Sequence, residues 1–189
     1  MTLTHQQNQV LNFVVLKHRD QKRKYTGEPY WNHLFSVARI VDEYVKEEGV
    51  IEIALCHDLL EDTNCTPMDI VYMMLQQGYK KEIADKVRDC VIELTDLYTK
   101  ENYPNENRKE RKRLEAIRLG KISPLAQSVK YADLIDNTSS VVQHDLGFAV
   151  KYLEEKGEIL EQMKEGDKEL YTKCLSVYDE AVNLLYLKL

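Results

Sequence analysis

Glycine and proline are scarce in this chain, which has seven glycines and four prolines in 189 residues. These two residues supply most tight turns, so their scarcity argues against a fold built from many short strands. Apolar residues instead recur at the three- and four-residue spacing of helices along nearly the whole chain. The sequence therefore predicts an all-α protein.

Long apolar runs are also absent. No stretch approaches the roughly 20 apolar residues that are needed to span a bilayer. Residues 1–7 carry no basic segment followed by an apolar core, which is the pattern of a secretory signal. We therefore expect neither a membrane-spanning segment nor a secretory signal, and no membrane partner.

The four cysteines lack the C-x-x-C spacing of zinc ribbons and redox motifs, and a disulfide framework is not expected at this length. Cys56, Cys90 and Cys174 fall on apolar helical stripes, so we expect them to be small core residues. This use of cysteine predicts a reduced, cytoplasmic setting.

An excess of positive charge is missing as well, because the formal net charge is −6. A negative chain is a poor partner for nucleic acid over its whole surface, although a local basic pocket is compatible with this charge. The length and the hydrophobic content of 43% fit one globular domain over residues 1–189.

Capping residues mark where helices begin and end. Thr66 and Ser123 each precede a proline, the order typical of a helix N-terminus, and Gly49 and Gly78 follow helical stretches. The polar stretch 98–107 indicates a loop, and its length suggests that it covers or borders a pocket. The predicted helices cover about residues 5–19, 30–48, 50–63, 66–78, 80–97 and 108–119, a stretch from 124 onward, 148–164 and 167–188.

One imidazole and three carboxylates lie close together directly after an apolar run, at His57, Asp58, Glu61 and Asp62. If residues 50–62 form one helix, the first two lie one turn before the last two on the same face. Such a face could hold a metal ion with one pair and present the other pair to water or substrate. A frayed, solvated helix end is the simpler alternative.

Further polar groups stand on other predicted helices. Asp133 and Asn137 are four residues apart and would share a helix face. His33 lies near the start of the second helix, where a hydrogen-bonded structural histidine is the more common role. The charge run 108–113 is either a solvated helix face or a set of phosphate contacts.

Four blocks, 27–33, 57–63, 110–114 and 129–133, together contain the order H…HD…D. This arrangement resembles the HD-domain metal-dependent phosphohydrolases. Within them it is most similar to the hydrolase domain of the Rel/SpoT-type alarmone hydrolases and their small stand-alone relatives. The resemblance implies an HD-domain helical bundle with its motif-bearing core at about 18–140, on which C-terminal helices at 147–188 pack.

The resemblance also implies a metal site. The ligands would be His33, His57, Asp58 and Asp133, a mixed nitrogen and oxygen set that suits Mn²⁺, with Fe²⁺, Co²⁺ or Zn²⁺ as substitutes. The neighbouring acids would orient or deprotonate the attacking water, with the first of them nearer the nucleophile. These two acids are Glu61 and Asp62.

Substrate contacts follow from the same resemblance. Arg23 and Lys24 resemble a basic segment that packs on the nucleotide, because a guanidinium can both stack on a purine and face phosphate. Asn137 resembles a ribose-contacting asparagine. Further phosphate ligands would be Lys112 and Lys130.

The sequence departs from the Rel/SpoT pattern at two positions. Leu34 stands where that family usually has proline, which affects only the entry into the helix. Ser139 stands where the family has arginine, so the identity of the phosphate groups that are recognised stays open.

The leading hypothesis is a guanosine-3′,5′-bis(diphosphate) 3′-pyrophosphohydrolase with a small-molecule nucleotide substrate. One alternative is a nucleotide phosphatase that acts on the 2′-phosphate of NADPH or on a nucleoside monophosphate. The other is a non-catalytic nucleotide-binding bundle, which would have no need of the second acidic pair at Glu61 and Asp62. No synthetase activity is expected from the length of the chain.

Overall fold

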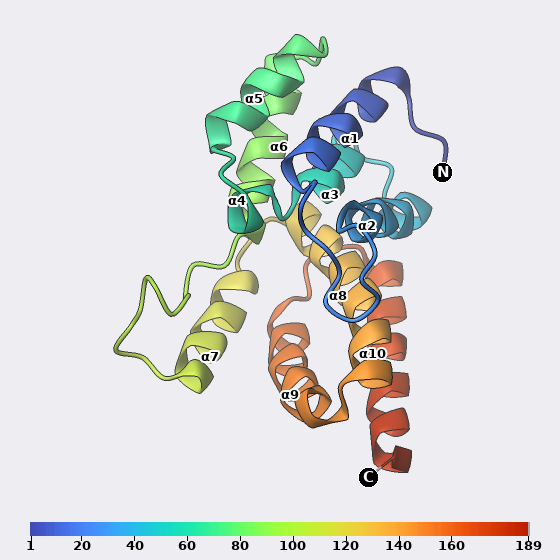
Figure 1. Cartoon of the computed structure of the whole chain (residues 1–189), viewed down its shortest axis with the longest axis vertical. Helices are drawn as coiled ribbons and strands as arrows, with labels where there is room; N and C mark the ends of the chain where they lie inside the picture. The colour runs from blue at the N-terminus through green and yellow to red at the C-terminus, as the bar shows by residue number, and fades with distance from the viewer. Residues whose placement is uncertain (189) are drawn as a thin grey trace. The chain divides into compact units, whose positions relative to one another are not determined.

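The computed structural model describes residues 1–188, and these form ten α-helices with one isolated β-bridge, between Lys22 and Pro29 (Figure 1). The all-α prediction is therefore confirmed. No helix among the described residues is long and apolar enough to cross a membrane.

The chain divides into two compact units, one from Met1 to Thr95 (unit 1) and one from Asp96 onward (unit 2). Each unit has helices that pack on one another, and each is described by itself. The prediction of a single domain over residues 1–189 stays a prediction.

Unit 1 is arranged around α3, which packs on α1, α2 and α6. All seven residues of α3 are buried, including Glu52, whose carboxylate accepts a hydrogen bond of 2.7 Å from the Tyr79 hydroxyl. Burial and this carboxylate raise the pKa of Tyr79 above its usual value. The helices of unit 1 are α1 His5–Lys17, α2 Trp31–Tyr44, α3 Val50–Cys56, α4 Leu59–Asp62, α5 Pro67–Gln76 and α6 Lys81–Leu94.

The expectation of one helix over 50–62 is wrong, because the chain turns at His57 and Asp58 between α3 and α4. The His57 ring donates from Nδ1 to the Ala54 carbonyl oxygen at 2.7 Å. In a continuous helix that oxygen would accept from the amide of Asp58. Asp58 has φ −97° and ψ 0°, outside the helical region, so the turn points these two side chains in directions that a regular helix does not allow.

Unit 2 is arranged around α8, which packs on α9 and α10, while α7 packs on α9. The predicted start at Ser123 is confirmed, since its hydroxyl caps the amide of Ala126 and Pro124 is the first helical residue. The helices of unit 2 are α7 Arg108–Leu119, α8 Pro124–His144, α9 Leu146–Gln162 and α10 Lys168–Lys188.

The predicted caps in unit 1 are also confirmed. Thr66 and Asp69 form a reciprocal capping box at the start of α5, and Gly49 and Gly78 adopt positive φ at helix boundaries. The cysteines predicted to be core residues are buried and form no disulfide, and the same is true of Cys65.

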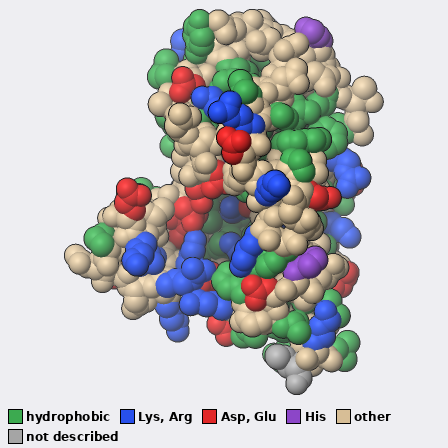
Figure 2. Space-filling model, in the orientation of Figure 1, with side chains coloured by type: hydrophobic (Ala, Val, Ile, Leu, Met, Phe, Trp, Pro, Cys, Tyr) green, Lys and Arg blue, Asp and Glu red, His purple; other side chains and the backbone are tan. Residues whose placement is uncertain are grey.

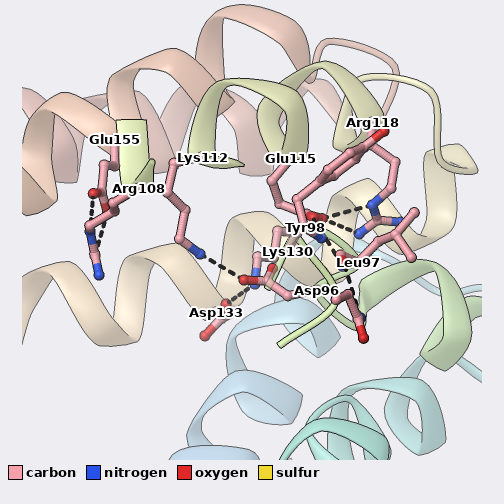
Figure 3. Close-up of polar contacts among 11 residues, drawn as sticks. Asp96, Leu97, Tyr98, Arg108, Lys112, Glu115, Arg118, Lys130, Asp133 and Glu155 are labelled. Atoms are coloured by element: carbon pink, nitrogen blue, oxygen red, sulfur yellow. Dashed lines mark hydrogen bonds and ion pairs between the residues drawn. The ribbon is translucent and has the colours of Figure 1, made fainter. Parts of the chain in front are cut away.

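The segment between α6 and α7 is held by one buried carboxylate. Glu115 of α7 is 1% exposed, and its Oε2 accepts from the amides of Leu97 and Tyr98 at 3.0 and 2.9 Å (Figure 3). Its Oε1 accepts from Arg118 Nε at 2.7 Å. The loop predicted over 98–107 is thus anchored where it begins.

We predict that Glu115→Ala lowers the free energy of unfolding by about 2–4 kcal/mol, because it leaves two amides and a guanidinium without their acceptor. Chemical denaturation monitored by circular dichroism measures this loss. The control Glu154→Ala, at an exposed position of α9, should change stability by no more than about 0.5 kcal/mol. A loss at Glu115 equal to that of the control would contradict the anchoring role.

Candidate metal centre

Three potential metal ligands come together in unit 1. His33 lies on α2, and His57 and Asp58 lie at the turn after α3. One ligand atom from each lies within 4.8 Å of the others. Asp58 Oδ2 is 3.1 Å from His57 Nε2 and 3.7 Å from His33 Nε2. Ligand atoms about 2.1 Å from one ion are separated by roughly 3 to 4 Å, so these distances suit a shared ion.

Burial makes this group of side chains informative. His33 and His57 are each 2% exposed, and Asp58 is half-buried beside them. Ionisable groups in the interior are costly unless they are hydrogen-bonded, paired or bound to metal. A solvated helix end, the alternative left open by the sequence, does not describe two buried imidazoles.

The tautomer of His57 follows from its hydrogen bond. A carbonyl oxygen can only accept, so Nδ1 carries the proton toward Ala54, and in a neutral ring Nε2 then presents a lone pair. That lone pair lies 3.1 Å from a carboxylate oxygen of Asp58. Two electron-pair donors at this separation repel one another unless a proton or a cation lies between them. The donor set of two imidazoles and one carboxylate therefore fits a divalent cation.

Three residues that were not predicted as site residues support the site. Tyr30 donates from its hydroxyl to Asp58 Oδ2 at 2.7 Å, and the His18 ring stacks on Tyr30 with centroids 5.3 Å apart. Gln21 Oε1 accepts from His18 Nδ1 at 2.6 Å, while its amide Nε2 donates to Asp62 Oδ2 at 2.8 Å. Tyr30, three residues before His33 at the start of α2, is the one that helical spacing could have suggested.

The two acids proposed for the chemistry, Glu61 and Asp62, are exposed and lie at the end of α4. Because the chain turns before α4, they do not follow His57 and Asp58 along one helix face, as the sequence had suggested. Asp62 is positioned by the Gln21 amide, across 41 residues of sequence.

The basic loop before α2 is a tight, backbone-bonded turn. The Arg23 amide donates to the Glu28 carbonyl at 2.8 Å, and Gly27 adopts φ 71°, a conformation that favours glycine. The Lys24 ammonium lies 4.7 Å from the centre of the Tyr25 ring. The nucleotide contacts expected of Arg23 and Lys24 stay predictions.

The remaining candidate residues lie in unit 2. Asn137 Nδ2 donates to Asp133 Oδ1 at 2.6 Å, which confirms that these two share a face of α8. Lys130 Nζ lies 2.8 Å from Asp133 Oδ2, and Lys112 Nζ donates to Asp96 Oδ2 at 2.7 Å (Figure 3). The role of Asp133 as fourth metal ligand stays a prediction.

Asp96 was not among the predicted residues, yet it is the partner of Lys112. Burial alone would raise the pKa of Asp96, but the ammonium groups of Lys112 and Lys130 outweigh burial and hold that pKa below its usual value. Asp96 is therefore a carboxylate at neutral pH. Polar loop residues just after a helix carry no periodic signal, which is why the sequence did not identify it.

The chain is similar in sequence to known alarmone hydrolases, although no family model matches it. It is 35% identical over 130 residues to "Guanosine-3′,5′-bis(diphosphate) 3′-pyrophosphohydrolase MESH1" of Drosophila melanogaster, and 36% identical over 129 residues to the Homo sapiens protein of that name. Each alignment covers 67% of this chain and 64% of the relative, so the chain spans somewhat less than two thirds of these relatives.

A longer relative matches over a smaller share. The "GTP pyrophosphokinase rsh" of Brucella melitensis is 36% identical over 101 residues, which are 53% of this chain and 13% of the relative.

The fold has a solved counterpart in the structure titled "A metazoan ortholog of SpoT hydrolyzes ppGpp and plays a role in starvation responses". The TM-score is 0.78 at 24% identity, over 95% of this chain and 97% of that one. The resemblance to Rel/SpoT-type alarmone hydrolases that the motifs predicted is therefore confirmed in sequence, and the helical-bundle fold is confirmed by structure.

We predict that His57→Ala weakens Mn²⁺ binding by more than about 100-fold, because it removes an oriented imidazole from the ligand set. Thermal unfolding with and without Mn²⁺ measures this, since an ion that binds only the folded chain raises Tm. The control His144→Ala removes an exposed imidazole and should keep the full shift. An undiminished Mn²⁺ shift in His57→Ala would exclude the proposed centre.

Proposed function

We propose that this chain is an HD-domain phosphohydrolase that removes the 3′-diphosphate of guanosine tetra- or pentaphosphate. The observation that best supports the proposal is that buried His33 and His57 meet half-buried Asp58 in a chain similar in sequence and fold to alarmone hydrolases. The names of the MESH1 relatives supply the substrate class, and the geometry supplies a place for the chemistry.

The cation would be held by His33, His57 and Asp58, with Asp133 as the fourth ligand. Mn²⁺ suits this mixture of imidazole and carboxylate, and Fe²⁺, Co²⁺ or Zn²⁺ are substitutes. When bound, such an ion lowers the pKa of a coordinated water and offsets negative charge on phosphoryl oxygens. Tyr30 keeps Asp58 in place through the hydrogen bond from its hydroxyl.

We assign Glu61 and Asp62 different roles toward the attacking water. Asp62 accepts from Gln21, which fixes the direction of its carboxylate, so we assign it an orienting role. Glu61 is the general base that takes the proton of the attacking water. A carboxylate in this role contributes a rate factor of about 10²–10⁴.

Substrate recognition is assigned to basic and amide side chains. Arg23 and Lys24 would pack on the purine and face a phosphate, and Asn137 would contact the ribose. Lys112 and Lys130 are the phosphate ligands, each now held by a carboxylate that a phosphate can replace or share. The four cysteines are buried and form no disulfide, which is consistent with a reducing, cytoplasmic compartment.

A second substrate class is favoured by one observation. Ser139 stands where the Rel/SpoT pattern has arginine, and its hydroxyl donates to the Ile135 carbonyl at 2.9 Å, so it adds no charge to the site. A nucleotide with fewer phosphate groups, such as NADPH or a nucleoside monophosphate, is therefore the alternative substrate.

A substrate panel with added Mn²⁺ tests the proposed function. We expect pyrophosphate release from guanosine tetraphosphate, with slower or no phosphate release from NADPH and nucleoside monophosphates. Phosphate and pyrophosphate are measured by ion chromatography. Turnover of NADPH without pyrophosphate release from guanosine tetraphosphate would replace the leading function by the alternative. No turnover of any of them would contradict a phosphohydrolase function and favour the non-catalytic bundle.

We predict that Glu61→Gln lowers kcat by about 10²–10⁴-fold while the Mn²⁺-induced rise in Tm is retained, because the amide cannot accept the proton but removes no metal ligand. Initial rates and thermal unfolding measure the two properties. The control Glu43→Gln alters an exposed residue of α2 and should leave both unchanged. Near-normal turnover of Glu61→Gln would show that Glu61 is not the general base.

A further inference from the structure

A third lysine, Lys156, interacts electrostatically with the two proposed phosphate ligands of unit 2. Lys156 lies on α9, is half-buried, and has its ammonium 5.3 Å from the centre of the Tyr152 ring. The charges that act on it belong to Lys130 and Asp133 of α8, Lys112 of α7 and Asp96. We call Lys112, Lys130 and Lys156 the lysine cluster.

The carboxylates of this region are already engaged by other groups. Asp133 accepts a hydrogen bond from Asn137 at Oδ1 and forms an ion pair with Lys130 through Oδ2. Asp96 forms an ion pair with Lys112 through Oδ2. Within residues 1–188, the Lys156 ammonium makes no hydrogen bond or ion pair, and it lies over the Tyr152 ring. Lys156 thus keeps donors for a further acceptor.

The position is costly for a cation. Burial, followed by the ammonium groups of Lys130 and Lys112, lowers the pKa of Lys156 to about 8, although Asp133 and Asp96 act in the opposite direction. A charge in such a place destabilises the folded chain unless an anion joins it. Strongly perturbed ionisable groups of this kind are frequent at functional sites.

We propose that Lys156 is a substrate-binding residue whose ammonium contacts a phosphate group of the nucleotide, so that the lysine cluster forms one anion site on unit 2. This inference rests on the proposed function for the identity of the nucleotide. The cluster holds three ammonium groups against two carboxylates, an excess of one positive charge that a phosphate neutralises.

The location of the cluster fits this role. Lys112 also lines a surface groove of about 750 Å³ beside α7 and α9, so the cluster has an edge that solutes can reach. Lys and Arg side chains gather over α7 in the space-filling view (Figure 2).

A purely structural lysine would behave differently when it is replaced. Its methylene stem could simply cover Tyr152, as long charged side chains often do, and its loss would then lower stability. If Lys156 instead serves to bind an anion, its replacement has the opposite effect on stability. Removal of the buried charge then raises the stability of the free protein and weakens anion binding. The two roles therefore predict opposite changes in Tm.

The test compares Lys156→Met, Lys156→Arg and the control Lys173→Met, which alters an exposed residue of α10. Isothermal titration of the full chain with inorganic pyrophosphate, without divalent metal, reports on the lysines alone. We expect Lys156→Met to bind pyrophosphate about 10- to 100-fold more weakly, the effect of one charge-assisted hydrogen bond, and to have a higher Tm. Lys156→Arg should stay within about threefold of the original chain, and Lys173→Met should match it.

Kinetics with Mn²⁺ and guanosine tetraphosphate form the second arm, in which Lys156→Met should raise KM more than it lowers kcat. Unchanged pyrophosphate affinity in Lys156→Met, no pyrophosphate binding by the original chain, or a lower Tm with unchanged KM would each overturn the inference. Pyrophosphate binding that depends on Lys156 in a chain that does not hydrolyse guanosine tetraphosphate would support the anion site and reject the proposed substrate.

Discussion

The hydrogen bond from His57 Nδ1 to the Ala54 carbonyl is the interaction on which the candidate metal centre depends. It accompanies the end of α3, fixes the tautomer of the ring, and turns Asp58 toward both imidazoles. Helix α3 can place this turn reliably because all of its residues are buried and it packs on α1, α2 and α6. Core packing and site chemistry are therefore linked through one side chain.

The second organising constraint is the pairing of buried charge. Each of the lysines Lys112 and Lys130 is held by a carboxylate, and Glu115 satisfies two amides and Arg118. Such pairs keep ionised groups in half-buried places at tolerable cost. Lys156 departs from this rule, and a departure without local compensation is where a ligand is expected.

Sequence patterns predicted most of the helices because their causes are local. The proline and capping residues at 66–67 and 123–124 act within one turn, and the apolar spacing of α6 requires only its own residues. The H…HD…D order identified His33, His57 and Asp58 before any geometry was known. The contacts from Tyr30 to Asp58 and from Gln21 to Asp62 join residues 28 and 41 positions apart, and no local pattern encodes such distances.

The sequence by itself determined the helical class, the helix boundaries to within a few residues, and the identity of the chemical groups, because propensity, capping and residue type are local properties. Tertiary structure decided how those groups are used. It replaced one helix over 50–62 by a turn at His57, brought His33 beside it, and gave Lys112 and Lys130 their carboxylates. These outcomes depend on which helices pack together, and burial and charge pairing act only after that packing has formed.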